Sequence, residues 1–80
     1  MAEITGEVRE QVKKIVCDVL EVGPGELDDT TLFHEEFGVD SLAIIEILTV
    51  IEDSLGITID QAETPRMGSL AGIYDVLAEA

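Results

Sequence analysis

The most constraining feature of this sequence is the helical spacing of the apolar residues in its first quarter. These residues recur at intervals that place them on one stripe of an amphipathic helix: Val8, Val12, Ile15, Val16, Val19 and Leu20. Thr5 is a suitable N-cap, and Gly23 followed by Pro24 is typical of a helix end. The pattern therefore predicts a helix over residues 6–22.

A second helix is predicted in the middle of the chain, beginning at Asp40 or Ser41 and ending at about Leu55. Its apolar residues fall within roughly 100° of arc, which is the width of a core-facing stripe: Ile44, Ile47, Leu48, Ile51 and Leu55. Leu42 falls on the opposite, solvent-facing side, and Ile45 lies at the boundary between the two faces. We therefore expect Leu42 to be exposed next to Ser41.

Two shorter helical segments are predicted in the last quarter. Asp60 and Glu63 have the spacing of a capping box and predict a short helix over residues 60–63. Ser69 then caps a last helix that runs to about Leu77 and carries four apolar residues at helical spacing: Leu70, Ile73, Tyr74 and Leu77. Gly72 inside this helix lowers its intrinsic helix propensity by about 1 kcal/mol.

The connection over residues 23–38 is predicted to be a long loop, and residues 57–59 a short extended link. The loop has apolar residues that can anchor it to the helices: Leu27, Leu32, Phe33 and Phe37. No strand pattern or repeat is present. The sequence thus predicts a single all-α domain over residues 1–80, a four-helix bundle with three main helices and a short third one.

Cys17 is the only cysteine, so a disulfide within the chain is impossible and an aliphatic core must hold the fold.

The net charge is −14, and thirteen acidic residues but no Lys or Arg lie between Ile15 and Pro65. This charge excludes nucleic acid as a direct partner. It is compatible either with solubility alone or with electrostatic steering toward basic partner surfaces. We also expect self-repulsion to make the fold marginally stable at low salt.

No segment approaches the roughly 20 apolar residues of a membrane span, and no secretory signal pattern is present. We therefore expect a cytoplasmic, monomeric protein without membrane contact. The start at Met1 and the compact ending at Ala80 favour a free-standing protein.

Other kinds of chemistry find little support in the sequence. His34 is the only histidine, and a Ser-His-Asp hydrolase would need it beside Ser41, yet no Gly-x-Ser-x-Gly motif is present. We expect His34 to be an ordinary loop residue and Cys17 a half-buried apolar one. The acids within residues 26–36 lack the spacing of a calcium loop, so no metal site is expected. Because no hydrolase motif surrounds Ser41, no catalytic residue is expected either.

Asp40 and Ser41 can be read simply as an N-cap and the first residue of a helix. Nearly the whole chain, however, resembles the acyl carrier proteins of fatty acid and polyketide synthesis. The resemblance rests on an ordered set of motifs: Gly38-x-Asp40-Ser41-Leu42, Glu46, the acidic pair Glu52-Asp53, Gly56-Ile57-x-Ile59, and the final apolar helix.

The resemblance implies that a phosphopantetheinyl transferase, using coenzyme A and magnesium, attaches 4′-phosphopantetheine to Ser41. The terminal thiol of this arm would then carry acyl groups as thioesters. Asp40 would be recognised during this transfer. The start of a helix favours a phosphate by about 0.3–1 kcal/mol, but repulsion from Asp40, Glu35 and Glu36 opposes it. Acyltransferase, ketosynthase and other synthase enzymes would dock on the second helix through five residues: Leu42, Ile45, Glu46, Glu52 and Asp53.

Ala43 and Ile44 follow the Asp-Ser-Leu triplet where fatty-acid carriers often have another acid. This start resembles the discrete carriers of type II polyketide synthases more closely. A fatty-acid carrier and a peptidyl carrier stay as alternatives, although the peptidyl carriers usually have Gly-Gly before the residue that precedes serine. An alternative of another class is an acidic helical interaction domain without a prosthetic group.

Overall fold

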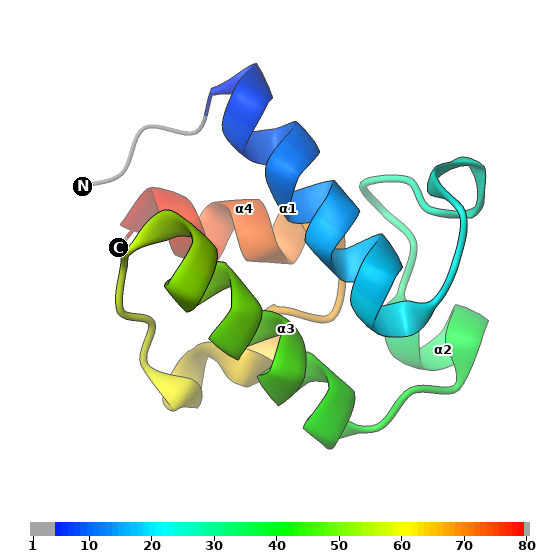
Figure 1. The fold of residues 1–80 in the computed structure, drawn as a ribbon. Helices are drawn as coiled ribbons and strands as arrows, with labels where there is room; N and C mark the ends of the chain where they lie inside the picture. The colour runs from blue at the N-terminus through cyan, green and yellow to red at the C-terminus, as the bar shows by residue number, and fades with distance from the viewer. Residues whose placement is uncertain (1–4, 80) are drawn as a thin grey trace.

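The computed structural model describes residues 5–79, and within that range the chain is helical with no strand. Figure 1 shows the helices in their order along the chain: α1 (Gly6–Leu20), the 3₁₀ helix η1 (Pro24–Glu26), α2 (Phe33–Phe37), α3 (Ser41–Leu55), the 3₁₀ helix η2 (Gln61–Arg66) and α4 (Leu70–Glu79). The all-α class and the three main helices are confirmed. The short helix expected at 60–63 is η2, whereas α2 and η1 lie in the segment predicted to be a loop.

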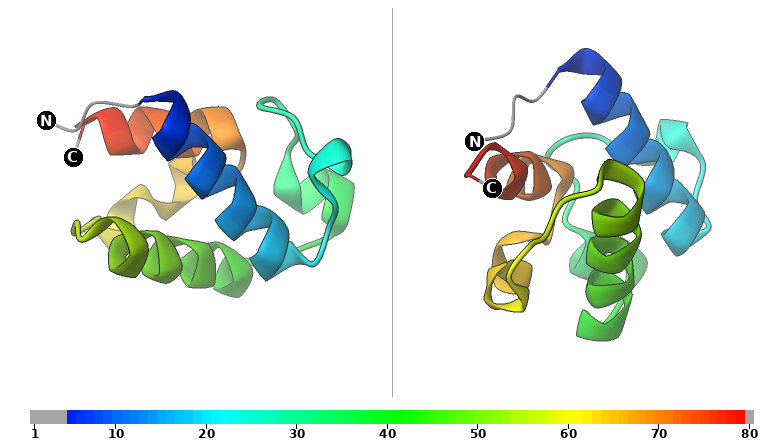
Figure 2. Two further views of the ribbon diagram at one scale, coloured as in Figure 1. Left: turned by 45° about the horizontal axis from the view of Figure 1, so that its top comes forward. Right: turned by 60° about the vertical axis from the view of Figure 1, so that its left-hand side comes forward.

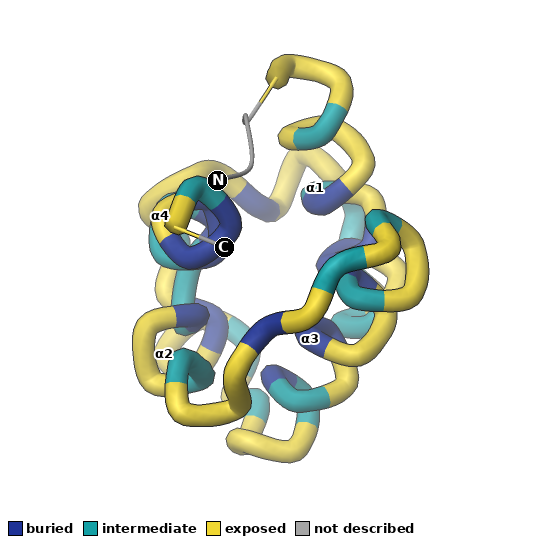
Figure 3. The backbone as a smooth tube through the Cα atoms, turned by 90° about the vertical axis from the view of Figure 1, so that its left-hand side faces the viewer, coloured by how far each residue is buried: buried dark blue, intermediate teal, exposed yellow. Residues whose placement is uncertain are grey.

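The three long helices enclose one core. Helix α1 packs against both α3 and α4, and η2 joins α3 to α4 from the other side (Figure 2). The buried positions of α1, α3 and α4 lie on the parts of the tube that turn toward the middle of the molecule (Figure 3). The predicted stripes supply most of this core: Val12, Ile15, Val16, Ile44, Ile47, Leu48, Ile51, Leu70, Ile73, Tyr74 and Leu77.

Helix α1 ends earlier than the sequence predicts. Its last residue is Leu20, and the left-handed residue that follows is Glu21, with φ at 56°, instead of Gly23. The Val22 N–H donates to the Cys17 carbonyl at 3.0 Å, and the Val22 side chain packs against the core. This pairing is the hydrogen bond of a Schellman-type helix end, and burial of Val22 favours it over a longer helix.

The segment predicted as a loop is ordered by its own side chains. The Asp28 carboxylate accepts hydrogen bonds from the Thr30 N–H and from the hydroxyls of Thr30 and Thr31, at 2.8 to 3.1 Å. These bonds lower the pKa of Asp28. The turn leads into α2, of which Phe33 is the first residue.

Three of the four expected anchors contact the core, but Leu32 does not. Leu27 and Phe33 are buried and Phe37 is partly buried, whereas Leu32 is 48% exposed because it precedes α2 and Phe33 fills the core position. The segment is also held by backbone hydrogen bonds. The Phe33 N–H donates to the Gly68 carbonyl at 2.9 Å, and a second bond of 2.9 Å joins residues 71 and 29.

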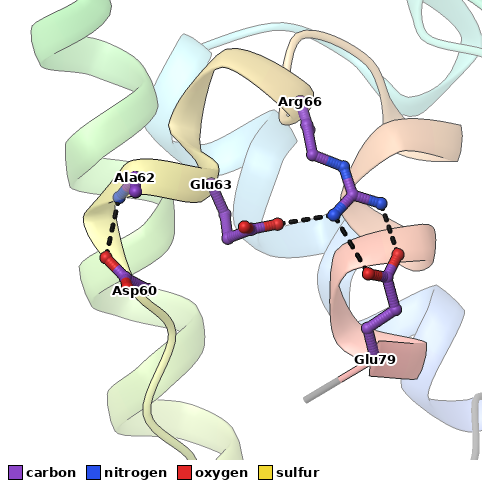
Figure 4. Close-up of polar contacts among 5 residues, drawn as sticks. All are labelled: Asp60, Ala62, Glu63, Arg66 and Glu79. Carbon is purple, nitrogen blue, oxygen red and sulfur yellow. Dashed lines mark hydrogen bonds and ion pairs between the residues drawn. The ribbon is translucent and has the colours of Figure 1, made fainter.

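Helix η2 begins at the expected acidic N-cap, since the Asp60 carboxylate accepts from the Ala62 N–H at 2.9 Å. The predicted capping box is wrong, however. The Glu63 carboxylate pairs with Arg66 at 2.6 Å, and Arg66 also binds Glu79 at the end of α4 (Figure 4). Hydrogen bonds to Glu79 and Glu63 raise the pKa of Arg66, and the same contact lowers the pKa of Glu79.

Candidate functional site

Ser41 is the first residue of α3 and is exposed. Asp40 before it has an extended backbone, and its carboxylate accepts a hydrogen bond from the Ala43 N–H at 3.2 Å. The aspartate thus caps the helix, as the sequence predicts, and Ser41 stands at the point where α3 begins. A hydroxyl group in this position is open to a partner enzyme and lies at the positive end of the helix dipole.

A short connection places this serine beside α2. Gly38 ends α2 with φ at 63°, a value that favours glycine, and its N–H donates to the His34 carbonyl. The His34 ring then reaches forward, with 2.7 Å between its Nδ1 and the Val39 carbonyl oxygen. The glycine of the Gly38-x-Asp40-Ser41 motif therefore has a backbone role, because it turns the chain from α2 into α3.

Ser41 borders a shallow, mostly apolar depression of about 330 Å³. Val39, Asp40 and Ile44 line it from the α3 side, and His34 lines it from α2. The remaining lining residues come from the end of η2 and from the residues after it: Thr64, Pro65 and Gly68. The sequence did not predict this depression, because its walls come from three separate segments.

The five residues expected to form a docking face divide into two groups. Leu42 is 63% exposed, and Glu46 and Asp53 are exposed on the same side of α3. Ile45 is half-buried, as its boundary position predicts, and so is Glu52. The carboxylate of Glu52 accepts a hydrogen bond from the Ile59 N–H at 2.7 Å, so part of this side chain is engaged within the fold.

The sequence prediction of the docking face did not include one exposed apolar residue of α3. Val50 is 40% exposed and follows Leu42 by eight residues, with Glu46 midway between them. Residues four and eight apart share one side of a helix. The same spacing that identified the core face could therefore have identified this one.

The structure places Cys17 and His34, the two reactive side chains discussed above, differently from the sequence prediction. Cys17 is buried rather than half-buried, and burial raises the pKa of its thiol. His34 lies on α2 instead of in a loop and is exposed. Its Nδ1 partner is a backbone carbonyl, whereas a hydrolase triad needs a carboxylate at that position.

The described part of the chain offers neither a metal site nor a membrane span. Within residues 5–79, no group of three or more His, Cys, Asp and Glu side chains could hold a metal ion. No helix in the same range is long and apolar enough to cross a membrane.

Comparison with known proteins identifies the family. The family model described as "Phosphopantetheine attachment site" matches residues 10–75. The chain belongs to the acyl carrier protein family. It is 47% identical over 72 residues to "Polyketide-8 synthase acyl carrier protein 1" of Streptomyces avermitilis, covering 90% of this chain and 86% of that protein.

Other acyl carrier proteins are more distant relatives. The chain is 36% identical to "Polyketide-8 synthase acyl carrier protein 2" of the same organism, over 86% of this chain and 79% of that protein. It is 35% identical to an acyl carrier protein of Nitratidesulfovibrio vulgaris, over 89% of this chain and 93% of that protein. This membership favours a carrier over an interaction domain without a prosthetic group.

The prosthetic group of this family is 4′-phosphopantetheine, and the surroundings of Ser41 fit it. The exposed hydroxyl lies at a helix N-terminus, which favours a phosphate, and Ser41 borders an apolar depression. The acyl carrier protein therefore has a suitable position for the group in the middle of the region that the family model matches.

Proposed function

We propose that this acyl carrier protein is a single carrier domain over residues 1–80, bears its arm on Ser41 and carries acyl groups between the enzymes of a bacterial type II polyketide synthase. The observation that carries the proposal is the exposed Ser41 at the start of α3, within the matched region. The polyketide assignment is supported by the 47% identity to a protein named as a polyketide synthase carrier and by Ala43 after the Asp-Ser-Leu triplet.

In the attachment step, the Ser41 hydroxyl loses its proton to the transferase and forms an O–P bond to the phosphopantetheine phosphorus of coenzyme A. The pyrophosphate bond breaks, and adenosine 3′,5′-bisphosphate leaves. The carrier supplies the position and the transferase the catalysis. Asp40 holds the start of α3 through Ala43 and presents its charge for recognition. When bound, the group supplies a thiol that carries acyl thioesters.

Partner enzymes would meet the exposed side of α3. Leu42 and Val50 offer apolar contacts there, and Glu46 and Asp53 offer charges for a basic surface. The net charge of −14 supports fast, salt-sensitive association with the transferase, acyltransferase and ketosynthase. The same charge opposes self-association, so we propose that the carrier acts as a monomer. We further propose that it works in the cytoplasm and is itself not an enzyme, in keeping with the carrier role of the family.

Intact mass spectrometry tests the attachment. The protein is incubated with coenzyme A, magnesium and a phosphopantetheinyl transferase of broad specificity, and one arm should be added. Ser41→Ala should abolish the addition. Ser54→Ala is the matched control, because Ser54 is exposed near the other end of α3 and should not affect loading. Addition that survives Ser41→Ala would refute the assignment.

The pathway is tested separately with the loaded protein. Turnover of the malonyl-loaded carrier is compared between a polyketide ketosynthase and a fatty-acid ketosynthase. Faster turnover by the polyketide enzyme is expected. Faster turnover by the fatty-acid enzyme would assign the chain to fatty acid synthesis instead, and specific aminoacylation by an adenylating enzyme would favour a peptidyl carrier.

A further inference from the structure

A phosphate on Ser41 would be favoured by the start of α3 but opposed by neighbouring carboxylates. The Asp40 carboxylate borders the same depression, and Glu35 and Glu36 follow on α2. No Lys or Arg occurs between Ile15 and Pro65. The next basic residue, Arg66, already binds Glu63 and Glu79. Within this stretch, His34 is the one side chain that can become a cation.

The position of the His34 ring suits this role. His34 and Ser41 border the same depression, and the two residues belong to different helices. The Nδ1 atom lies 2.7 Å from the Val39 carbonyl oxygen. Because a carbonyl oxygen can only accept a hydrogen bond, Nδ1 must carry a proton. A neutral ring would then have a lone pair on Nε2, whereas a protonated ring has an N–H there.

We propose that the protonated His34 ring binds the phosphate of the arm on Ser41, with the Nε2–H as the donor. The inference rests on the proposed function, since it requires the arm to be attached at Ser41. His34 is a positioning residue in this role: it holds the first part of the arm against the depression and takes no part in acyl transfer. The Val39 carbonyl fixes the ring by accepting from Nδ1.

Three carboxylates lie near His34, either at the same depression or next to it along α2. Asp40 borders the depression from the α3 side, and Glu35 and Glu36 are neighbours on α2. The wall from η2 contributes Thr64 and Pro65, which do not titrate. Replacing His34 alone, with all three carboxylates kept, therefore identifies which group acts on the phosphate.

The experiment follows the ³¹P chemical shift of the loaded, full-length protein between about pH 5.5 and 8. A phosphodiester keeps its single negative charge throughout this range, so an inflection must come from a neighbouring group. We expect an inflection in the wild-type protein and a flat curve in His34→Gln. Circular dichroism of both proteins checks that the helices are kept.

A matched control moves the histidine along the same helix. The double variant His34→Gln/Glu36→His keeps one imidazole on α2, but residue 36 borders a different depression. Its ³¹P curve should stay flat, whereas an inflection as large as that of the wild type would overturn a direct contact. An inflection that persists in His34→Gln alone, or a flat wild-type curve, would also overturn the inference.

Mass spectrometry of each sample distinguishes a failure of arm attachment from a failure of the His34 contact. A protein that gains no arm on Ser41 refutes the proposed function, and the role of His34 fails with it. A protein that is fully loaded but shows no ³¹P inflection refutes the role of His34 alone, and leaves the carrier function intact.

Discussion

The Glu52 carboxylate accepts a hydrogen bond from the backbone N–H of Ile59, with 2.7 Å between the two atoms. This bond joins α3 to the extended link before η2, and it lies next to the buried Ile59 side chain. Glu52 was expected from the sequence to serve partner docking. Its geometry gives it a structural task within the fold as well.

Glu52→Ala should therefore lower the free energy of unfolding by about 1–2 kcal/mol, because it leaves the Ile59 N–H without its partner. Glu52→Gln should cost less, since an amide oxygen can still accept the bond. Glu46→Ala is the control, as an exposed residue whose loss should change stability by about 0.5 kcal/mol or less. Urea unfolding measures all three, and equal stabilities would contradict the structural role of Glu52.

Gly72→Ala should destabilise the protein by about 1–3 kcal/mol, the usual cost of overpacking. A methyl group built on Gly72 would lie 2.0 Å from the Arg66 carbonyl oxygen, so the backbone of α4 or η2 must move. Gly6→Ala is the matched control, because nothing lies within 4 Å of its added carbon. It should be neutral or stabilising by up to about 1 kcal/mol, and thermal unfolding compares the two.

Substitutions of Asp40 can separate helix capping from recognition. Asp40→Asn keeps an oxygen that accepts from the Ala43 N–H, so stability should change little while the charge is lost. Asp40→Ala should also remove about 1 kcal/mol of stability. If the transferase recognises the charge, both variants should be loaded more slowly. Normal loading of Asp40→Asn would show that only the cap matters.

Stability should fall at alkaline pH through Cys17. Burial raises the pKa of this thiol above its ordinary value of 9.0, and Lys13 only partly opposes this. Above that value the unfolded chain releases the thiol proton while the folded chain retains it, so rising pH favours unfolding. The free energy of unfolding should drop more between about pH 8 and 10 in the wild type than in Cys17→Ala. Parallel curves in urea titrations would contradict this.

The melting temperature should rise when sodium chloride is added to a low-salt buffer. The net charge of −14 makes the folded chain repel itself, and salt screens this repulsion over distances near 10 Å at 0.1 M. An uncharged osmolyte at the same osmolality is the control for effects unrelated to screening. A melting temperature that is insensitive to ionic strength would show that repulsion does not limit stability.

Helix α3 was predictable because its signals are local. The N-cap Asp40, the apolar spacing and the closing Gly56 all lie within the helix or next to it, and both ends agree with the structure. The exposure of Leu42 and the half-burial of Ile45 followed from the same spacing. The prediction that Ser41 is the attachment residue rested on the motif around it. The helical spacing of apolar residues alone could not have led to this prediction.

Several predictions failed where distant parts of the chain meet. Glu63 and Arg66 are close in sequence, but the partner that completes their ion pair, Glu79, lies on another helix (Figure 4). The short α2 is supported by Gly68, far along the chain, through the Phe33 N–H. Helix propensity alone does not predict such a short helix, because its stability comes from tertiary contacts.

The bond from the Phe33 N–H to the Gly68 carbonyl joins two of the three segments that surround the depression at Ser41. Its α2 side and the segment after η2 are therefore held together through the backbone. The third side, formed by Ile44 and the start of α3, carries Ser41 itself. The attachment residue thus stands on the side of the depression that this bond does not reach, next to the exposed Leu42.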